Sequence, residues 1–182
     1  MRKVYHTVCM LAALCVTTSC DDFLDKMPDK RAEINSNQKI NELLVSAYPN
    51  VDPMMIYEHR TDNVMDNGRR FGDPARMIVE NYFWEDISET DWDAPEALWN
   101  SCYGAIAAAN QALDAIRALG SGSGNDPQRG EALLCRAYAH FLLVNTFCQP
   151  YRESSAISDM GIPYVEEPET VIGKLYDRGT VA

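Results

Sequence analysis

The sequence predicts an all-α fold in which antiparallel helix pairs are joined by long irregular loops. Two long segments, 94–119 and 126–149, carry apolar residues at the 3.6-residue spacing of amphipathic helices. The connector between them, 121–125, is short and contains only Ser, Gly and Asn. Two long helices joined by so short a loop pack antiparallel. One such pair leaves apolar surface uncovered, so further elements must stack on it.

The first 19 residues have the layout of a secretory signal. Arg2 and Lys3 precede the apolar run 8–16, and small residues then lead to Cys20. The apolar run is shorter than the ~20 residues that a membrane-spanning helix needs. A cysteine at this junction is typical of a lipoprotein, so we expect Cys20 to become the acylated first residue. The lipoprotein pattern prefers leucine three residues earlier, where this chain has threonine, so plain secretion stays an alternative.

Composition excludes a nucleic-acid binder. The 182 residues contain 27 acidic and 16 basic side chains, a net charge of −11. Removal of 1–19 takes two basic residues and no acidic ones, so 14 basic against 27 acidic residues give −13. Phosphate neutralisation needs a clustered excess of Lys and Arg. Three cysteines stay in the mature chain besides Cys20, and we expect them to be buried apolar side chains: Cys102, Cys135 and Cys148.

Shorter elements are predicted ahead of the helix pair. An acidic tether, 20–34, follows the signal. The first helix is predicted to begin near Asn35, with Gln38 as its capping-box partner, and to stop at Pro49. A second, shorter helix is predicted over 53–65.

The long pair has recognisable start and stop signals. Asp93 is predicted to cap its first helix, with Pro95 in the first turn and Gly120 closing the last turn. Asp126-Pro127 is predicted to cap the second helix, and Pro150 to end it. The apolar stripe predicted for the first helix is Leu98, Trp99, Cys102, Tyr103, Ile106, Ala109, Leu113 and Ile116. The stripe predicted for the second is Leu133, Leu134, Ala137, Phe141, Val144, Phe147 and Cys148.

The C-terminal part is predicted to differ from the helical part. Prolines on both sides keep 161–170 extended. Residues 178–182 are typical of a cap that begins another helix.

The sequence predicts no metal site, no cofactor and no catalytic group. His59 and His140 lie in different segments without a Cys or acid at ligand spacing. Eight acidic residues and no Lys or Arg occur between Met77 and Ile116. A hydrolase would need two of them facing across a cleft, and a solvated acidic face is the simpler interpretation.

Aromatic residues in the acidic region suggest ligand binding. Tyr82, Phe83, Trp84 and Trp92 precede the first long helix, and sugar rings stack their apolar faces on aromatic planes. Sugar hydroxyls need polar partners, which the chain offers at Asn67, Arg69, Arg70 and Asn81. The simpler alternative is that Trp84 and Trp92 only cover the helix pair.

Several short motifs together resemble the N-terminal part of the SusD/RagB family of Bacteroidetes outer-membrane lipoproteins, over essentially the whole chain. They are Ser19-Cys20 followed by Asp-Asp-Phe-Leu-Asp, Leu43-Leu44-x-x-Ala47-Tyr48, Thr61-Asp62-Asn63-Val64, Trp99-x-x-x-Tyr103-x-x-Ile106-x-x-x-Asn110, Gly130-Glu131-Ala132 with Arg136-Ala137-x-x-x-Phe141, and Gly161-Ile162-Pro163-Tyr164-Val165. The Trp99/Tyr103 and Ala137/Phe141 spacings are also similar to those of tetratricopeptide helix pairs.

The resemblance implies a lipid-anchored, surface-exposed protein of the cell outer membrane with tetratricopeptide-like helix pairs. It would bind a glycan or another nutrient and work with a SusC-like TonB-dependent transporter in nutrient import, without catalysis. The helix-pair side would meet the transporter, and loops would carry the ligand. Ligand residues vary within the family, so Asn67, Arg69, Trp84 and Trp92 mark a region only.

The resemblance also implies that 35–182 is the incomplete N-terminal helical region of a longer SusD-like fold. A function from another class stays open: a secreted helical-repeat module whose only partner is protein. An acid-pair hydrolase ranks third.

Overall fold

A computed structural model of the chain describes residues 33–182 except for 69, 71, 91, 121–123 and 172. The chain divides into two compact units, 1–34 and 35–182. The predicted signal peptide, Cys20 and most of the tether therefore lie outside the described residues. The described part is helical, as predicted, and its only β pairing is an isolated bridge. No helix in it is long and apolar enough to cross a membrane.

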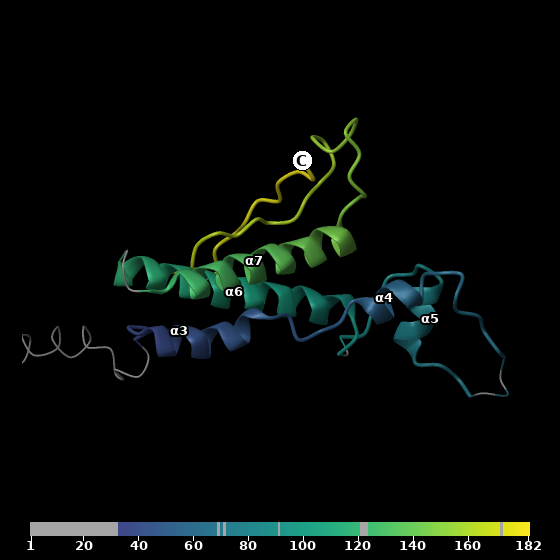
Figure 1. The fold of residues 1–182 in the computed structure, drawn as a ribbon. Helices are drawn as coiled ribbons and strands as arrows, with labels where there is room; N and C mark the ends of the chain where they lie inside the picture. Colours follow the sequence, from purple (N-terminus) through teal and green to yellow (C-terminus); the bar gives the residue numbers. More distant parts are fainter. Residues whose placement is uncertain (1–32, 69, 71, 91, 121–123, 172) are drawn as a thin grey trace, which may run out of the picture. The chain divides into compact units, whose positions relative to one another are not determined.

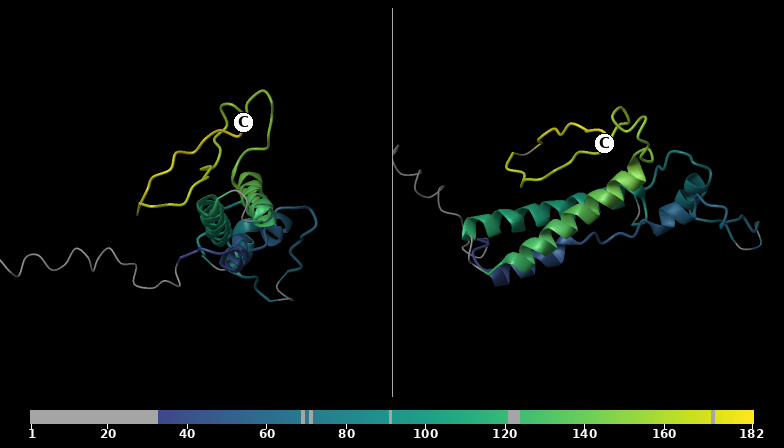
Figure 2. Two further views of the ribbon diagram at one scale, coloured as in Figure 1. Left: turned by 60° about the vertical axis from the view of Figure 1, so that its left-hand side comes forward. Right: turned by 45° about the horizontal axis from the view of Figure 1, so that its top comes forward.

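The second unit is organised around an antiparallel hairpin of α6 (Pro95–Leu119) and α7 (Asp126–Phe147). Figures 1 and 2 show the two helices side by side along most of their length. The predicted Pro95 and the acidic Glu96 occupy the first turn of α6. Gly120 ends it with a φ of 82°, which glycine adopts without strain. The predicted cap is wrong, because Ala94 rather than Asp93 holds that position and provides no side-chain hydrogen bond.

The start of α7 is shifted by one position from the prediction. Asn125 is its N-cap residue, and Asp126 and Pro127 form the first helical positions. Proline is tolerated there because the first turn has no intrahelical partners for its N–H groups.

Small side chains line the interface between α6 and α7, which corrects the stripe predicted for α7. On α6, the predicted Leu98, Cys102 and Ile106 are buried. The predicted stripe of α7 included Leu134 and Phe141, but these side chains are 70% and 60% exposed. The buried residues of α7 are instead Ala132, Cys135, Ala139, His140, Leu142 and Leu143.

The physical reason lies on α6, whose buried face includes five alanines: Ala105, Ala108, Ala109, Ala112 and Ala115. Helices approach each other closely where the contacting side chains are small. The alanine-containing face of α7 fits this surface, and its bulkier face is left outside. We call that outer row, Leu133, Leu134, Tyr138 and Phe141, the exposed face of α7.

Helix α3 (Asn37–Leu44) and the 3-10 turn η2 (Val45–Ala47) contact both long helices. Ile40, Leu44 and Ala47 are buried there. The N-cap is Ser36, whose Oγ accepts a hydrogen bond from the Lys39 N–H at 3.3 Å, rather than the predicted Asn35.

Because Ser36 holds the N-cap position, the capping box predicted with Asn35 and Gln38 is not the cap of this helix. The Gln38 side chain donates instead to Glu42 Oε1, at 3.0 Å.

Two short helices lie beyond α3 at the other end of the hairpin (Figure 1). Helix α4 (Met54–Glu58) is shorter than the predicted 53–65, because the Thr61 hydroxyl donates to Glu58 O and turns the chain. Helix α5 (Arg76–Tyr82) was not predicted. Two of its three buried residues, Glu80 and Asn81, are polar, so the sequence has no apolar stripe that would predict this helix.

The C-terminal segment, 160–182, is extended over 161–170 as predicted and is tied to the hairpin by polar contacts. Asn110 Nδ2 donates to Val165 O at 3.1 Å, and Tyr103 Oη donates to Pro163 O at 2.8 Å. The Val165 N–H donates to His140 Nε2 at 3.2 Å, and His140 Nδ1 lies 2.9 Å from Arg136 O. Burial lowers the pKa of His140, and these contacts fit a neutral ring.

Residues 178–182, predicted to be the cap of a further helix, are not helical. Thr180 instead pairs with Met160 in an antiparallel bridge. The Gly161 N–H donates to Gly179 O at 2.8 Å, and Arg178 Nε donates to Gly161 O at 2.7 Å.

Two glycines in this fold should respond oppositely to alanine. A Cβ at Gly161 would lie 2.5 Å from Thr180 O, a backbone atom, whereas a Cβ at Gly104 in α6 would meet nothing within 4 Å. We expect Gly161→Ala to lower the free energy of unfolding by about 1–3 kcal/mol through overpacking. The matched change Gly104→Ala should raise it by about 0.5–1 kcal/mol. Urea denaturation measures both, and a Gly161→Ala protein as stable as the parent would contradict the bridge.

Candidate functional site

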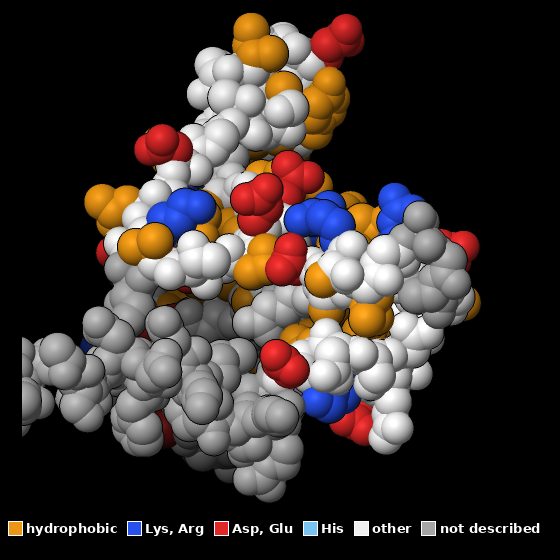
Figure 3. Space-filling view, turned by 90° about the vertical axis from the view of Figure 1, so that its left-hand side faces the viewer, with side chains coloured by type: hydrophobic (Ala, Val, Ile, Leu, Met, Phe, Trp, Pro, Cys, Tyr) orange, Lys and Arg blue, Asp and Glu red, His pale blue; other side chains and the backbone are white. Residues whose placement is uncertain are grey.

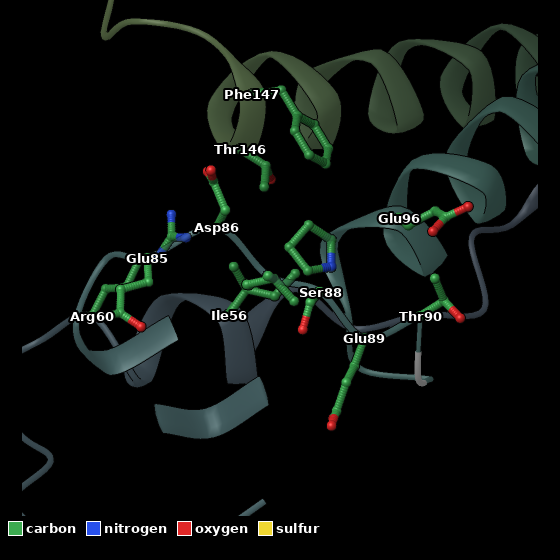
Figure 4. A pocket seen from close by; sticks show the side chains of 12 residues that line it. Ile56, Arg60, Glu85, Asp86, Ser88, Glu89, Thr90, Glu96, Thr146 and Phe147 are labelled. Atoms are coloured by element: carbon green, nitrogen blue, oxygen red, sulfur yellow. The ribbon is translucent and has the colours of Figure 1, made fainter. Parts of the chain in front are cut away.

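A cavity of about 420 Å³ lies where the amino end of α6 meets the carboxyl end of α7. Figure 4 shows its walls converging from the turn after α4, from segment 85–90 and from both long helices. The charged residues that line the cavity are Arg60, Glu85, Asp86, Glu89 and Glu96, and Phe147 provides an aromatic wall.

Asn81 is the buried amide that fixes Arg60 at this cavity. Its side chain is 2% exposed, and its Nδ2 donates to Ile56 O of α4 at 3.1 Å. Its Oδ1 accepts a hydrogen bond of 2.7 Å from Arg60 Nε. His59 Nδ1 is 3.5 Å from Asn81 Nδ2. Because both ends of the amide are used inside the protein, Asn81 orients Arg60 and does not offer the ligand contact that the sequence suggested.

Trp84 lies beside Arg60 in a strained backbone conformation. The guanidinium carbon of Arg60 is 4.8 Å from the centroid of the Trp84 ring, a cation–π contact. Trp84 has a φ of 59°, the only positive φ of a non-glycine residue in the described part of the chain. A non-glycine residue in this conformation costs about 1–2 kcal/mol.

The strain has a specific origin in the end of α5. The Glu85 N–H donates to Glu80 O at 2.9 Å, and the Trp84 N–H donates to Asn81 O at 3.2 Å. These two bonds form a Schellman motif, in which the position held by Trp84 is usually glycine. The ring is nevertheless 68% exposed, so packing does not account for a tryptophan here. Residues with strained backbone conformations are concentrated at functional sites.

Glu80 organises the acidic segment that lines the cavity. Its Oε2 accepts from the Ser88 N–H at 3.0 Å, and its Oε1 accepts from Ser88 Oγ at 2.9 Å. Arg76 Nε donates to the same Oε1 at 2.7 Å. The Ser88 backbone N–H is the main reason that the pKa of Glu80 lies below its usual value, and the Ser88 hydroxyl and Arg76 add to the effect. A fixed Ser88 holds Glu85, Asp86 and Glu89 at the cavity.

The charges of the cavity favour some ligands over others. Four carboxylates and one guanidinium line it. Carboxylates accept hydrogen bonds from hydroxyl groups, and the guanidinium donates to them. Next to the exposed face of an aromatic ring, this set suits a neutral polyhydroxylated ligand and repels an acidic one.

The residues predicted from sequence are only partly brought together. Trp84 does not line the cavity itself, but it contacts Arg60, which does. Asn67 is exposed on the segment before α5, Trp92 is 62% exposed in the turn before α6, and neither lines the cavity. Arg69 lies outside the described residues. The simpler interpretation of Trp84 and Trp92 as covers of the helix pair does not hold, because both rings are exposed.

The packing role belongs to another tryptophan, Trp99. Its ring lies 4.9 Å from the Tyr103 ring and 5.1 Å from the Phe147 ring.

Sequence reasoning missed most of the cavity lining. The run of acidic residues was noted in the sequence, but only the structure shows that Glu85, Asp86, Glu89 and Glu96 line the cavity. Arg60 could not be predicted as a site residue, because its hydrogen-bond partner Asn81 is 21 residues away in the sequence. Among the described residues, no group of three or more His, Cys, Asp or Glu side chains is placed to hold a metal ion.

Comparison with known proteins assigns a family. The sequence model of the family SusD-like_3, starch-binding associating with outer membrane, matches residues 22–182. A comparison with curated proteins finds no match.

The lowered pKa of Glu80 predicts acid sensitivity of this site. A carboxyl whose pKa is depressed by folding stabilises the protein above its unfolded-state pKa of about 4.3. That stabilisation is lost as the pH falls through the folded-state pKa. We expect Glu80→Gln to lower stability at pH 7 and to flatten the loss of stability in acid. Urea denaturation between pH 3 and 7 measures this, with Glu153→Gln, an exposed carboxyl elsewhere, as control. A Glu80→Gln protein with the parent's pH profile would contradict the network.

Proposed function

Because the chain belongs to the SusD-like family of starch-binding proteins associated with the outer membrane, we propose that it binds a neutral oligosaccharide beside Trp84 and Arg60 for nutrient import. The observation that carries this proposal is Trp84, an exposed ring in a strained conformation that contacts Arg60, a residue of the acid-lined cavity. A sugar ring would stack on Trp84 while its hydroxyls bind the carboxylates and Arg60. The protein would act by binding, without catalysis.

The wider ligand region is also a proposal. Asn67 precedes α5 and Trp92 precedes α6, and Arg69, which the structure does not describe, stands two residues after Asn67 in the sequence. A chain of several sugars is longer than the cavity, so these residues would contact units outside it.

Anchoring follows from the signal. We propose that Cys20 carries the lipid and that the mature protein is exposed at the surface of the outer membrane. Stable anchoring needs more than one acyl chain, as an acylated N-terminal cysteine provides. Partition of the processed protein into the detergent phase tests this, and recovery in the aqueous phase would oppose it.

A SusC-like TonB-dependent transporter is the proposed partner. The exposed face of α7 supports a protein contact, because rows of exposed large apolar residues mark interaction sites. The same face favours the second candidate function, a secreted interaction module with protein partners only. Measurable glycan affinity would exclude that alternative.

Replacing Trp84 should separate binding from stability. We expect Trp84→Gly to weaken oligosaccharide binding about tenfold or more, since a stacking contact and the Arg60 platform are lost. Glycine relieves about 1–2 kcal/mol of backbone strain, and the lost cation–π contact costs about 0.5–1 kcal/mol. The free energy of unfolding should therefore not fall. Calorimetry with malto-oligosaccharides and other neutral glycans measures the first effect, and urea denaturation the second.

Tyr138→Ala, which removes an exposed ring from the middle of α7, is the control for the binding measurement. Equal affinity in Trp84→Gly and the parent protein would place the glycan elsewhere.

The exposed face of α7 gives a separate test of the partner. Leu134 and Phe141 are exposed, so the double change Leu134→Ser with Phe141→Ser should leave the fold and glycan affinity nearly unchanged. We expect it to reduce co-purification with the transporter from outer membranes severalfold. Leu175→Ser, at a side chain 96% exposed, is the matched control. Undiminished co-purification would remove the face from the proposed contact.

A further inference from the structure

His140 joins the C-terminal segment to the hairpin through the main chain of that segment. The residue is 5% exposed. Its Nε2 accepts a hydrogen bond of 3.2 Å from the Val165 N–H, and its Nδ1 lies 2.9 Å from Arg136 O. A backbone N–H only donates and a carbonyl oxygen only accepts, so these two partners fix the protons of the ring. Nδ1 carries a hydrogen and Nε2 carries none, which is the neutral imidazole.

A proton on Nε2 is incompatible with this attachment. A charged imidazole donates from both nitrogens, so its Nε2–H would face the Val165 N–H with no acceptor between them. The hydrogen bond to the segment would be lost. The charge would also lie at a buried site, where desolvation disfavours it. Attachment of the segment and protonation of His140 therefore oppose each other.

The groups that face His140 from the neighbouring elements do not reverse this effect. Arg136 of α7 repels a charged imidazole, and Glu166 of the C-terminal segment attracts it. The Glu166 side chain is 61% exposed and lies 3.7 Å from Arg136 Nη2, so water and the arginine weaken its attraction. The Tyr164 ring, 4.4 Å from the imidazole and 62% exposed, favours a cation only weakly. On α6, burial raises the pKa of Tyr103 to about 12, so it stays uncharged.

The other contacts that hold the segment do not change in mild acid. The hydroxyl of Tyr103, the amide of Asn110 and the guanidinium of Arg136 donate to main-chain carbonyl oxygens of 163–166. None of these donors gains or loses a proton between pH 7 and pH 5. Among the contacts that the structure describes for 163–166, the hydrogen bond to His140 is therefore the one that titrates in this range.

The attached segment covers part of α6. A cavity of about 250 Å³ lies between them, lined by Trp99, Tyr103 and Ile106 of α6 and by Pro163 and Val165 of the segment. In Figures 1 and 3 the C-terminal part of the chain projects at the top of the molecule, above the helix pair of Figure 1. The segment can thus move away without displacing a helix, and its departure would open this aromatic wall to solvent.

We propose that His140 is a pH-sensitive latch: in mild acid, uptake of one proton by His140 releases segment 161–170 from the hairpin and opens the aromatic surface of α6. The latch does not depend on the proposed glycan site.

The direction of the pH dependence follows from the two states of the ring. In the released state the imidazole is in water, with a pKa of about 6.5. In the attached state burial, and then the repulsion from Arg136, hold the pKa of His140 below that value. The balance between the states is therefore constant above pH 6.5. Below it, the released fraction grows by about tenfold per pH unit, the effect of one proton, until the pH reaches the pKa of the attached state.

Amide hydrogen exchange followed by NMR between pH 7.5 and pH 5 measures the release. The Val165 N–H exchanges from the released state, so its protection factor, corrected for the intrinsic pH dependence of exchange, reports the balance. We expect this factor to be constant above pH 6.5 and to fall by about tenfold per pH unit just below it. The Leu143 N–H, in the buried part of α7, should stay better protected at each pH. Equal protection of the two amides throughout would mean that only global unfolding frees the segment, and would overturn the latch.

Two variants and one spectrum make the result specific. His140→Gln has no titrating ring, so the protection factor of Val165 should be the same from pH 7.5 to pH 5. His59→Gln changes the other histidine of residues 33–182 and is the matched control, in which the fall should persist. A fall that persists in His140→Gln would contradict the proposal. The ring ¹⁵N shifts of His140 in the parent protein need no variant, and a hydrogen on Nε2 at pH 7.5 would also contradict it.

Discussion

The close packing of α6 against α7 through small side chains is the constraint on which the rest of the structure depends. Alanines on the buried face of α6 and Ala132 and Ala139 on α7 let the helices lie side by side. This packing decides which face of α7 is buried and which is left outside. It also brings the amino end of one helix to the carboxyl end of the other, at both ends of the hairpin. The acid-lined cavity lies at one junction, and a second cavity of about 430 Å³, lined by residues of the last turns of α6 and the first turns of α7, lies at the other.

Buried polar side chains then attach irregular segments to this helical frame. Asn110, 1% exposed, donates to Val165 O and accepts from Arg136, so it joins the C-terminal segment to both helices. Asn81 does the same for α4 and Arg60, and Glu80 does it for Ser88. Each of these groups has its partners, which is why a fold with so many loops can bury polar atoms without a large penalty. Removing one partner would leave the other buried and unpaired.

The sequence was sufficient to predict the elements that depend on local patterns. The long helix ending at Gly120, the antiparallel pair and the extended segment after Gly161 all follow from periodicity, glycine and proline. It was not sufficient where a distant partner decides the outcome. Helix α5 buries Glu80 and Asn81, and their partners lie 8 and 21 residues away. The buried face of α7 depends on the alanines of α6, because α7 itself offers two apolar faces.

The candidate site shows the same division. An exposed tryptophan in an acidic region could be read from the sequence, and Trp84 is such a residue. What distinguishes Trp84 is its φ of 59°, which the Schellman motif at the end of α5 imposes. Neither feature can be predicted from the sequence. Asn81 is a plausible ligand residue from its position in the sequence, but both ends of its side-chain amide form hydrogen bonds within the protein. The residue types in the sequence therefore indicated the region of the site. The hydrogen bonds in the structure show which of these residues can contact a ligand and which only support the fold.

The two ends of the hairpin differ in charge, and their separation lets them act independently. Four carboxylates and one guanidinium line the first cavity, whereas three guanidinium groups and two carboxylates line the second. The Debye length at physiological salt is about 8 Å, much shorter than the separation of about 25–36 Å that the helix rise gives from Glu96 to the lining residues Leu113–Gly120 of the second cavity. The charges at one end therefore have little effect on the potential at the other. The four carboxylates of the first cavity repel an acidic ligand. A neutral ligand escapes this repulsion, so the charge of the cavity and the exposed ring of Trp84 beside Arg60 support the same class of proposed ligand.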